Sequence, residues 1–149
     1  MKAEDFVGTW RACGMDYRAK DGTITQSSVA ADPTDATHPG RIVYTQDGTV
    51  IVLTTPANRR KLGSQFASGD ITSAPVEQRA EAANGVIAYA GHYEVDGERV
   101  LHHVDVAFFP DWVGTTNVRV YEFKGNRLIL STPPDAQGGV RRIHWQRMR

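Results

Sequence analysis

With 149 residues, of which 40% are hydrophobic and 23% charged, the chain is long enough to bury a substantial core, and we expect one domain over residues 1–149. Its 17 basic and 17 acidic residues cancel, so no overall charge attracts a nucleic acid or an anionic membrane, and neither is expected as a partner. The single Cys13 excludes an internal disulfide and a cysteine-based zinc site. The N-terminus lacks the apolar run of a secretory signal and no window could span a bilayer, so we expect a cytoplasmic location.

The first forty residues predict two strands and a loop. A short turn followed by a strand is expected within residues 5–17. An Asp-Gly turn comes next, and the β-branched residues of 23–29 predict a second strand. Residues 30–40 contain two prolines, two aspartates and a final glycine. Because such residues do not form a regular β-ladder, we expect a loop there.

The middle of the chain predicts a hairpin and the only helix. Residues 41–45 and 49–55 flank a Gln-Asp-Gly turn, whose glycine suits a bulged hairpin. Residues 56–70 show neither the helical nor the strand period, and so long an irregular loop is often functional or mobile. The helix that follows is predicted to start at Ser73 as N-cap and to end at Asn84, before a glycine. We expect this loop and helix to cover the mouth of a cavity.

Residues 88–116 contain the central hairpin of the predicted fold. Asp-Gly accepts the positive φ angles of a tight turn, so we place Asp96 and Gly97 as the two loop residues, which pairs Tyr93 with Val100. Side chains of a strand alternate between its faces, and the apolar face then holds Tyr89, Tyr93, Val95, Val100, His102, Val104 and Val106. The opposite face, expected to meet solvent, holds Ala90, His92, Glu94, Arg99, Leu101, His103 and Asp105. His102 is the odd residue on the apolar face.

The last third of the chain predicts three further strands. They cover residues 115–123, 127–131 and 140–147, after a corner bounded by proline and glycine at 109–114. Eight or more short strands joined mostly by hairpins, with one short helix, predict an all-β antiparallel up-and-down barrel, because closure removes exposed sheet edges. A barrel of this strand number is either filled by side chains or holds one small ligand.

Polar side chains on two neighbouring strands are predicted to meet inside this barrel. Asn117, Arg119 and Tyr121 share one face of their strand by the period of two. If that face and the face of His102 both point inward, an imidazole, a guanidinium, an amide and several phenols converge in an apolar cavity, which is the usual makeup of a small-molecule site. A structural role stays open beside this one, since buried polar groups are paired in any case. Trp112 is expected to line the mouth.

Metal and hydrolase chemistry find little support in the sequence. His102 and His103 are neighbours on a strand, point to opposite faces and cannot chelate one ion in regular geometry. His92, His103 and Asp105 share the solvent face and offer a surface metal site, but such residues are ordinary on an exposed sheet. No Gly-x-Ser-x-Gly elbow and no glycine-rich phosphate loop occurs. No metal site and no cofactor are therefore predicted.

Several motifs resemble the bacterial and fungal lipocalin-like domain family. Gly8-Thr9-Trp10 and Arg147 match the lipocalin arrangement in which a guanidinium of the last strand stacks on the indole of a Gly-x-Trp motif, a contact worth about 0.5 to 2 kcal/mol. The resemblance extends over nearly the whole chain through residues 44–48, 89–95, 102–104, 110–115, Arg119, 128–130 and 145–147. It implies a calycin-type barrel with a central cavity.

The resemblance also suggests the ligand class, because some relatives act in natural-product pathways where a cavity folds a polyketide or terpenoid chain. We expect the chain to bind such a small, largely apolar molecule. One hypothesis is a cofactor-independent isomerase or cyclase, in which His102 or Tyr93 transfers protons and Arg119 stabilises an enolate or carboxylate. The ligand-binding residues would be Tyr44, Tyr89, Asn117, Tyr121 and Trp112. The alternatives are a non-catalytic carrier and, more weakly supported, haem or metal binding through a histidine; the sequence leaves homodimerisation open.

Overall fold

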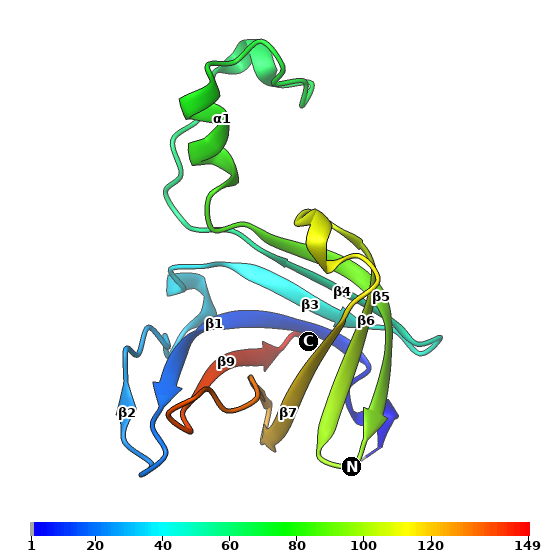
Figure 1. Ribbon diagram of the computed structural model, residues 1–149. Coiled ribbons are helices and arrows are strands. Elements are labelled where there is room, and N and C mark those ends of the chain that lie inside the picture. The colour runs from blue at the N-terminus through cyan, green and yellow to red at the C-terminus, as the bar shows by residue number, and fades with distance from the viewer. Residues whose placement is uncertain (1) are drawn as a thin grey trace.

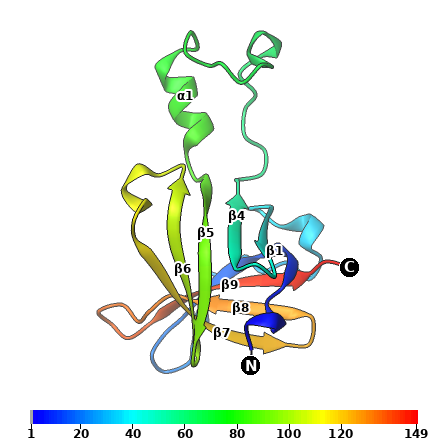
Figure 2. The same cartoon turned by 90° about the vertical axis from the view of Figure 1, so that its right-hand side faces the viewer.

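The computed structural model describes residues 2–149 and shows a closed antiparallel barrel from which one arm projects (Figures 1 and 2). Its strands are β1 (Gly8–Arg18), β2 (Ile24–Thr25), β3 (Gly40–Tyr44), β4 (Thr49–Thr54), β5 (Ile87–Asp96), β6 (Arg99–Ala107), β7 (Thr116–Lys124), β8 (Arg127–Ser131) and β9 (Val140–Arg147). From β3 to β9 each strand pairs with the next, and β1 joins β3 to β9, so the sheet closes on itself. Eight strands form the barrel, while β2 adds two residues beside β1. The predicted up-and-down barrel is confirmed.

Helical turns occupy the connections between strands. They are η1 (Ala3–Asp5), η2 (Pro33–Asp35), η3 (Ser64–Phe66) and η4 (Pro110–Trp112), all 3-10 turns, and the α-helix α1 (Val76–Ala83). Among residues 2–149 no helix combines the length and the apolar character needed to cross a bilayer.

Alternation of side chains gives the barrel its apolar interior. In β4, Val50 and Val52 are at most 5% exposed, whereas Ile51 between them is 46% exposed. Trp145 of β9 is likewise buried between two less buried neighbours, whereas residues 128–131 of β8 are all buried. β4 and β9 therefore turn one face toward the core, as the period of two predicts, while β8 is buried along most of its length.

Trp10 and Arg147 close one end of the barrel. The guanidinium carbon of Arg147 lies 4.1 Å from the centroid of the Trp10 ring. Arg147 also donates hydrogen bonds of 2.9 and 2.6 Å to the carbonyl oxygens of Val7 and Asp5. Gly8 is required here, because its φ is +135° and an added Cβ would come within 2.9 Å of the Arg147 guanidinium. The predicted closure is confirmed.

The central hairpin forms as predicted but in another register. Gly97 and Glu98 make the turn, so Asp96 pairs with Arg99 and Tyr93 pairs with His102 rather than with Val100. The shift is two residues on one strand, which leaves every side chain on its predicted face as far as Val104.

A β-bulge then changes the faces at the end of β6. Gly91 pairs with Val104 but Ala90 pairs with Val106, so β6 contains one extra residue at this point. The extra residue turns Val106 outward, where it is 59% exposed. The prediction that Val106 faces inward is wrong for this reason.

Two other predicted elements differ in extent. The strand expected over residues 23–29 shrinks to Ile24–Thr25, and the next residue, Gln26, has a φ of +53° that ends the regular ladder. The helix begins at Val76 with Pro75 at its N-cap position, not at Ser73, and no side chain caps it. Its end at Asn84, followed by a glycine of positive φ, is as predicted.

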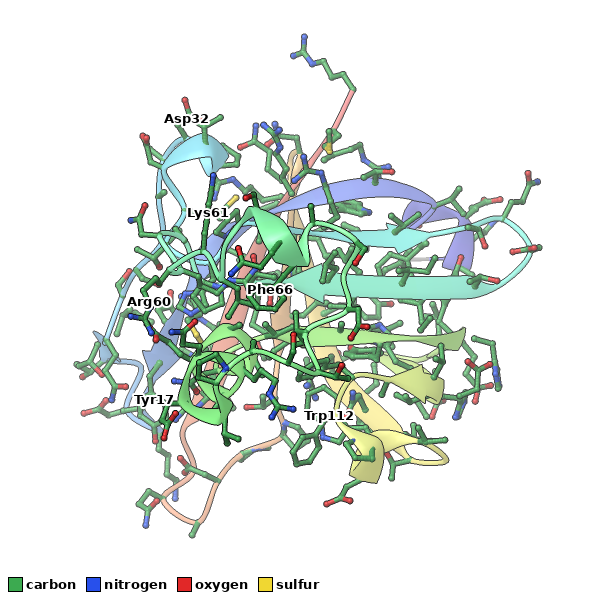
Figure 3. All side chains as sticks on the ribbon, turned by 90° about the horizontal axis from the view of Figure 1, so that it is seen from above. Tyr17, Asp32, Arg60, Lys61, Phe66 and Trp112 are labelled. Carbon is green, nitrogen blue, oxygen red and sulfur yellow. The ribbon has the colours of Figure 1, made fainter. Side chains whose placement is uncertain are left out.

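Residues 56–84, which we call the arm, stand apart from the barrel. Figures 1 and 2 show the arm extending beyond the end at which β4 stops and β5 starts, and Figure 3 looks down on it from that side. None of the residues of α1 is buried. The arm is tied together by a 2.7 Å hydrogen bond from Arg59 to the Ala82 carbonyl and by an exposed ion pair between Arg60 and Glu81.

Candidate functional site

The barrel encloses a cavity of about 550 Å³, within the size range of small-molecule sites. Its apolar wall comes from several strands and includes Ile42, Val52, Leu130, Ile143 and Trp145. Residues at the ends of strands, among them the paired Thr54 and Ile87, also line it, so the cavity opens at the end of the barrel from which the arm projects. The interior is therefore an apolar cup with one closed end.

His102 on β6 lies at the base of this cup between two tyrosines. It is 1% exposed, and its Nε2 and Nδ1 atoms each lie 2.8 Å from a phenol oxygen, that of Tyr44 on β3 and that of Tyr89 on β5. Burial, together with the nearby positive charges of Arg119 and His103, lowers the pKa of His102 to about 3. The imidazole is consequently neutral near pH 7, and neither nitrogen is open to a ligand.

The two polar residues of β7 join His102 on the cavity wall. Asn117 pairs directly with His102 across the sheet, and Arg119 pairs with Val100. Both line the cavity together with Tyr89. The Nη1 of Arg119 donates a 2.8 Å hydrogen bond to the Val118 carbonyl. The structure thus places His102, Asn117 and Arg119 together on the cavity wall, as expected from the sequence.

Three of the expected site residues lie elsewhere in the barrel. Tyr44, Tyr93 and Tyr121 point inward but are absent from the cavity lining. The Tyr93 hydroxyl donates to the Thr45 carbonyl at 2.9 Å, and the Tyr121 hydroxyl donates to the Gly97 carbonyl at 2.8 Å. They pack toward the closed end, so a proton transfer by Tyr93 to a ligand in this cavity has no geometric basis. Tyr44 acts on the cavity only through His102.

Trp112 takes the position expected for it. It ends η4, the corner between β6 and β7, and lines the cavity beside Phe109. Its ring meets that of Tyr89 edge to face, with centroids 5.7 Å apart. Figure 3, seen from the arm side, places Trp112 at the rim of the barrel. An aromatic corner therefore borders the mouth.

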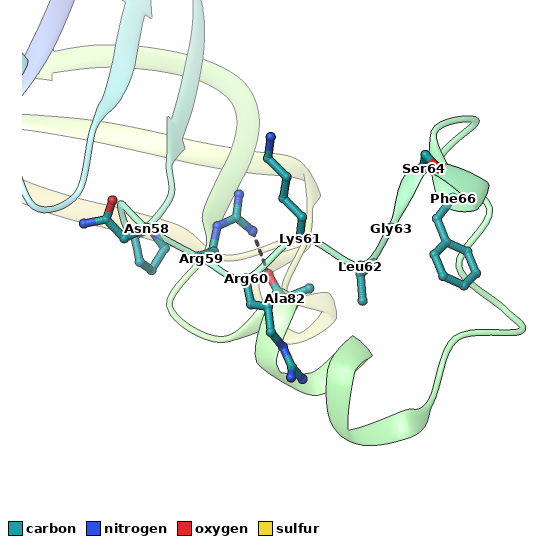
Figure 4. Close-up of a pocket in the computed structure, with 10 residues that line it drawn as sticks. Asn58, Arg59, Arg60, Lys61, Leu62, Gly63, Ser64, Phe66 and Ala82 are labelled. Atoms are coloured by element: carbon teal, nitrogen blue, oxygen red, sulfur yellow. Dashed lines mark hydrogen bonds between the residues drawn. The ribbon is translucent and has the colours of Figure 1, made fainter.

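A second and larger hollow lies within the arm, between its two sides. Figure 4 shows it between residues 58–66 and Ala82, and its volume is about 740 Å³. None of the residues that line it is buried, and three of them, Arg59, Arg60 and Lys61, are exposed cations. Residues 56–84 contribute nothing to the wall of the barrel cavity. The structure therefore does not place the arm as the cover of the cavity that the sequence suggested.

The histidines of the outer face are paired with protein groups. His103 accepts or donates through both ring nitrogens, with Nε2 2.7 Å from Glu94 and Nδ1 2.8 Å from Thr116, and His92 stacks on it with centroids 4.6 Å apart. Among residues 2–149 no three histidine, cysteine or acidic side chains gather in a way that could hold a metal ion.

A family model described as a lipocalin-like domain matches residues 7–148. The chain belongs to the lipocalin-like domain family. A curated relative is the 4'-hydroxy-3'-methoxypropiophenone carrier protein of Aspergillus oryzae (strain ATCC 42149 / RIB 40), which is 34% identical over 85 residues, or 52% of this chain and 72% of that protein.

Two solved structures resemble this lipocalin-like domain over nearly their whole length. An uncharacterized protein from Bacteroides eggerthii DSM 20697 is 10% identical, with a TM-score of 0.45 over 97% of this chain and 100% of that chain. The wild-type fluorescent protein UnaG is 12% identical, with a TM-score of 0.39 over 98% of this chain and 99% of that chain. Both scores are low, so the fold assignment rests on the strand pairing and on the family match.

Some residues of the cavity wall in the lipocalin-like domain were not predicted from the sequence. Trp145 and Ile143 alternate along β9, and the period of two could have assigned them to the cavity. His38 lies in the loop expected over residues 30–40, where no periodic signal indicates which way a side chain points, and Ser28 lies beyond the end of the strand predicted over residues 23–29, which stops at Thr25.

Proposed function

We propose that this lipocalin-like domain binds a small, largely apolar molecule in its barrel cavity and carries it without changing it. The supporting observation is the apolar cup itself, in which the one buried histidine is already saturated by Tyr44 and Tyr89. The relative from Aspergillus oryzae, described as a carrier of an aryl ketone, supports the same function. A cytoplasmic location is part of this proposal.

The state of His102 favours carriage over catalysis. A general base works best when its pKa is near the operating pH, and burial lowers the pKa of His102 to about 3. A base also needs a free lone pair, and both nitrogens of His102 are in hydrogen bonds. The same occupancy argues against haem or metal ligation by this residue.

A cofactor-independent isomerase or cyclase of a natural-product pathway is the second candidate. It is supported by the donors of Arg119, Asn117 and Tyr89 around one end of the cavity, because such groups stabilise an enolate as it forms. In that reaction the proton would have to move between ligand and water or between two ligand atoms, since Tyr93 does not line the cavity.

Fluorescence titration tests the carrier function. Trp112 and Trp145 line the cavity, so binding of propiophenone should quench tryptophan emission saturably, at one molecule per chain and with a Kd of roughly 1 to 100 µM for so small a ligand. Val52→Phe, which adds volume to the cavity wall, should weaken binding at least ten-fold. Val76→Phe makes the same change on the arm, where the side chain is 67% exposed, and should leave binding unchanged.

Absence of saturable binding across a panel of aryl ketones, or equal binding by Val52→Phe, would refute the cavity as the site. Recovery of the ligand by mass spectrometry after prolonged incubation with equimolar protein separates the two candidates. An unchanged ligand is expected of a carrier, and a product of the same mass but different retention would establish an isomerase or cyclase.

A further inference from the structure

The charged groups on the cavity wall are of one sign. Arg119 and Arg141 line the cavity, and no aspartate or glutamate does. Arg119 takes part in no ion pair among residues 2–149, and one of its N–H groups is used by the Val118 carbonyl. A guanidinium has five N–H donors and stays protonated, so most of its donors and its whole charge remain for another partner. Such a charge at an apolar wall favours an anionic guest.

The proton order around His102 adds a second donor. Tyr44 is 1% exposed, and within residues 2–149 its hydroxyl has His102 Nε2 as its one hydrogen-bond partner. Because an unpaired buried O–H is costly, Tyr44 donates to Nε2. A neutral imidazole has one N–H, so that proton is on Nδ1 and is donated to the Tyr89 oxygen. The hydroxyl proton of Tyr89 is then not used by the imidazole, and Tyr89 lines the cavity next to Asn117, with which its side chain also forms a hydrogen bond.

The chain of donors therefore runs in one direction, from the core to the cavity. Tyr44 donates to His102 and His102 donates to Tyr89, which leaves Tyr89 to donate to whatever fills the cavity. Burial raises the pKa of Tyr44 and Tyr89 above the usual value, which keeps both phenols protonated. Arg119 and the amide of Asn117 stand beside Tyr89, so this end of the wall presents donors and a positive charge.

The remainder of the wall indicates the shape of the guest. Four aromatic side chains line the cavity, namely Tyr89, Phe109, Trp112 and Trp145. Flat rings pack against such walls face to face or edge to face. The cavity therefore combines an aromatic enclosure with one cationic, donor-rich end.

We propose that the ligand is an aromatic molecule with an ionised oxygen, a phenolate or a carboxylate, and that Arg119 binds this oxygen with help from Tyr89 and Asn117. This inference rests on the proposed function, because it assumes that the barrel cavity is the binding site. It adds that the domain selects the anionic form of its ligand, and that His102 acts as a positioning residue by fixing which group Tyr89 can donate to.

Two probes of nearly equal size test the selection of an anion. 4'-Hydroxypropiophenone ionises when the pH rises from 6 to 9, because the para ketone acidifies the phenol, whereas 4'-methoxypropiophenone cannot ionise. The wild-type protein is expected to bind the hydroxy ketone at least ten-fold more tightly at pH 9 than at pH 6, while its affinity for the methyl ether changes less than three-fold.

Single-residue variants test which side chain causes the preference for the anionic ligand. Arg119→Met should abolish the gain in affinity for the hydroxy ketone at pH 9 and keep the affinity for the methyl ether within about three-fold. Tyr89→Phe should reduce the gain several-fold. Arg99→Met removes the same charge from the outer face, where the side chain is 51% exposed, and should behave as wild type.

The outcomes separate this inference from the proposed function. Equal affinity of the wild-type protein for both probes at pH 9 would overturn the selection of an anion and leave the carrier function standing. An equal loss of affinity for both probes in Arg119→Met would show that this side chain shapes the cavity and does not distinguish charged from neutral ligands. That result also overturns the inference. Failure of both probes to bind the wild-type protein would refute the cavity as the site and the inference with it.

Discussion

The barrel cavity and the hollow within the arm differ in how their walls are held. The cavity wall comes largely from paired strands, and two of its residues, His102 and Tyr89, are at most 8% exposed. The hollow within the arm is larger but has no buried residue in its wall. Size alone therefore does not indicate a binding site; a binding site also needs walls that keep their positions when the ligand is absent.

The energetics of the two regions explain this difference. Moving one wall of the barrel requires breaking β-ladder hydrogen bonds and exposing core side chains. Side-chain contacts between the two sides of the arm are a hydrogen bond from Arg59 to the Ala82 carbonyl and an ion pair between Arg60 and Glu81 whose side chains are 59% and 54% exposed. Exposed ion pairs of this kind typically contribute less than about 1 kcal/mol. The arm therefore has little to fix its shape.

The largest contrast between the regions should appear when an apolar side chain is truncated. Trp10→Ala removes the buried indole at the closed end and should lower the free energy of unfolding by about 3 to 5 kcal/mol. Val76→Ala on the arm should change it by less than about 0.5 kcal/mol, because Val76 is 67% exposed. Urea unfolding of both variants measures the contrast. A loss below about 1 kcal/mol for Trp10→Ala would contradict closure of the barrel by this residue.

Acid should weaken the barrel through His102. Its folded pKa, about 3, lies below the ordinary value of 6.5, so the unfolded chain binds this proton first. The stability is fully present above pH 6.5 and is lost as the pH falls toward 3; between pH 6.5 and 4 the loss for this group is on the order of 3 kcal/mol.

Replacement of the histidine isolates this contribution. Asp16 and His144 also have lowered pKa values, the former because Arg142 hydrogen-bonds it against the effect of burial and the latter because of burial, so they too weaken the fold in acid. In urea unfolding, His102→Gln should keep the loss of stability in acid that comes from Asp16 and His144. It should lack the additional loss between pH 6.5 and 4 that comes from His102. Identical pH profiles for His102→Gln and the wild type would show that His102 is not held neutral by the fold.

The sequence predicted which side of β5, of β6 as far as Val104 and of β7 faces inward, because side chains alternate along a strand. The register of the β5–β6 hairpin was wrong by two residues, yet a shift of two keeps the period of two, so His102 still points into the barrel. A single-residue change does reverse the faces, and the bulge that turns Val106 outward left no signal in the pattern.

The height of a side chain along the barrel axis could not be predicted in the same way. Tyr44 pairs with Gly8 near the closed end, whereas Tyr89 pairs with Val52 and lines the cavity. Both positions follow from the registers between strands that are distant in sequence. Alternation within one strand gives the face of a side chain but not these registers. The course of the arm could not be predicted either, because residues 56–70 show neither the helical nor the strand period and so do not indicate where the chain runs.

A smaller difference in stability should separate the buried Tyr44 from Tyr121, whose hydroxyl lies near solvent. Tyr44→Phe removes the hydroxyl that pairs with His102 Nε2 and leaves a buried nitrogen without a partner, which should cost about 1 to 3 kcal/mol of stability. Tyr121→Phe removes a hydroxyl that donates to the Gly97 carbonyl near solvent, and should cost about 0.5 kcal/mol. Thermal unfolding of both variants ranks them, and equal costs would contradict the buried hydrogen bond between Tyr44 and His102.

The smallest effect is expected from removing the arm. Thr54 and Ile87 are paired across β4 and β5, so their Cα atoms lie roughly 5 Å apart and a short loop can connect the strands. Residues 58–84 can be replaced by Gly-Ser-Gly-Ser, which keeps the 2.8 Å hydrogen bond from Ala57 to the Thr37 carbonyl. Because residues 56–84 do not line the cavity, the affinity for propiophenone should stay within about two-fold of the wild type, measured by the same titration. A loss of ten-fold or more, in a variant whose thermal unfolding is unchanged, would show that the arm folds over the bound ligand and that the cover expected from the sequence forms only when the cavity is filled.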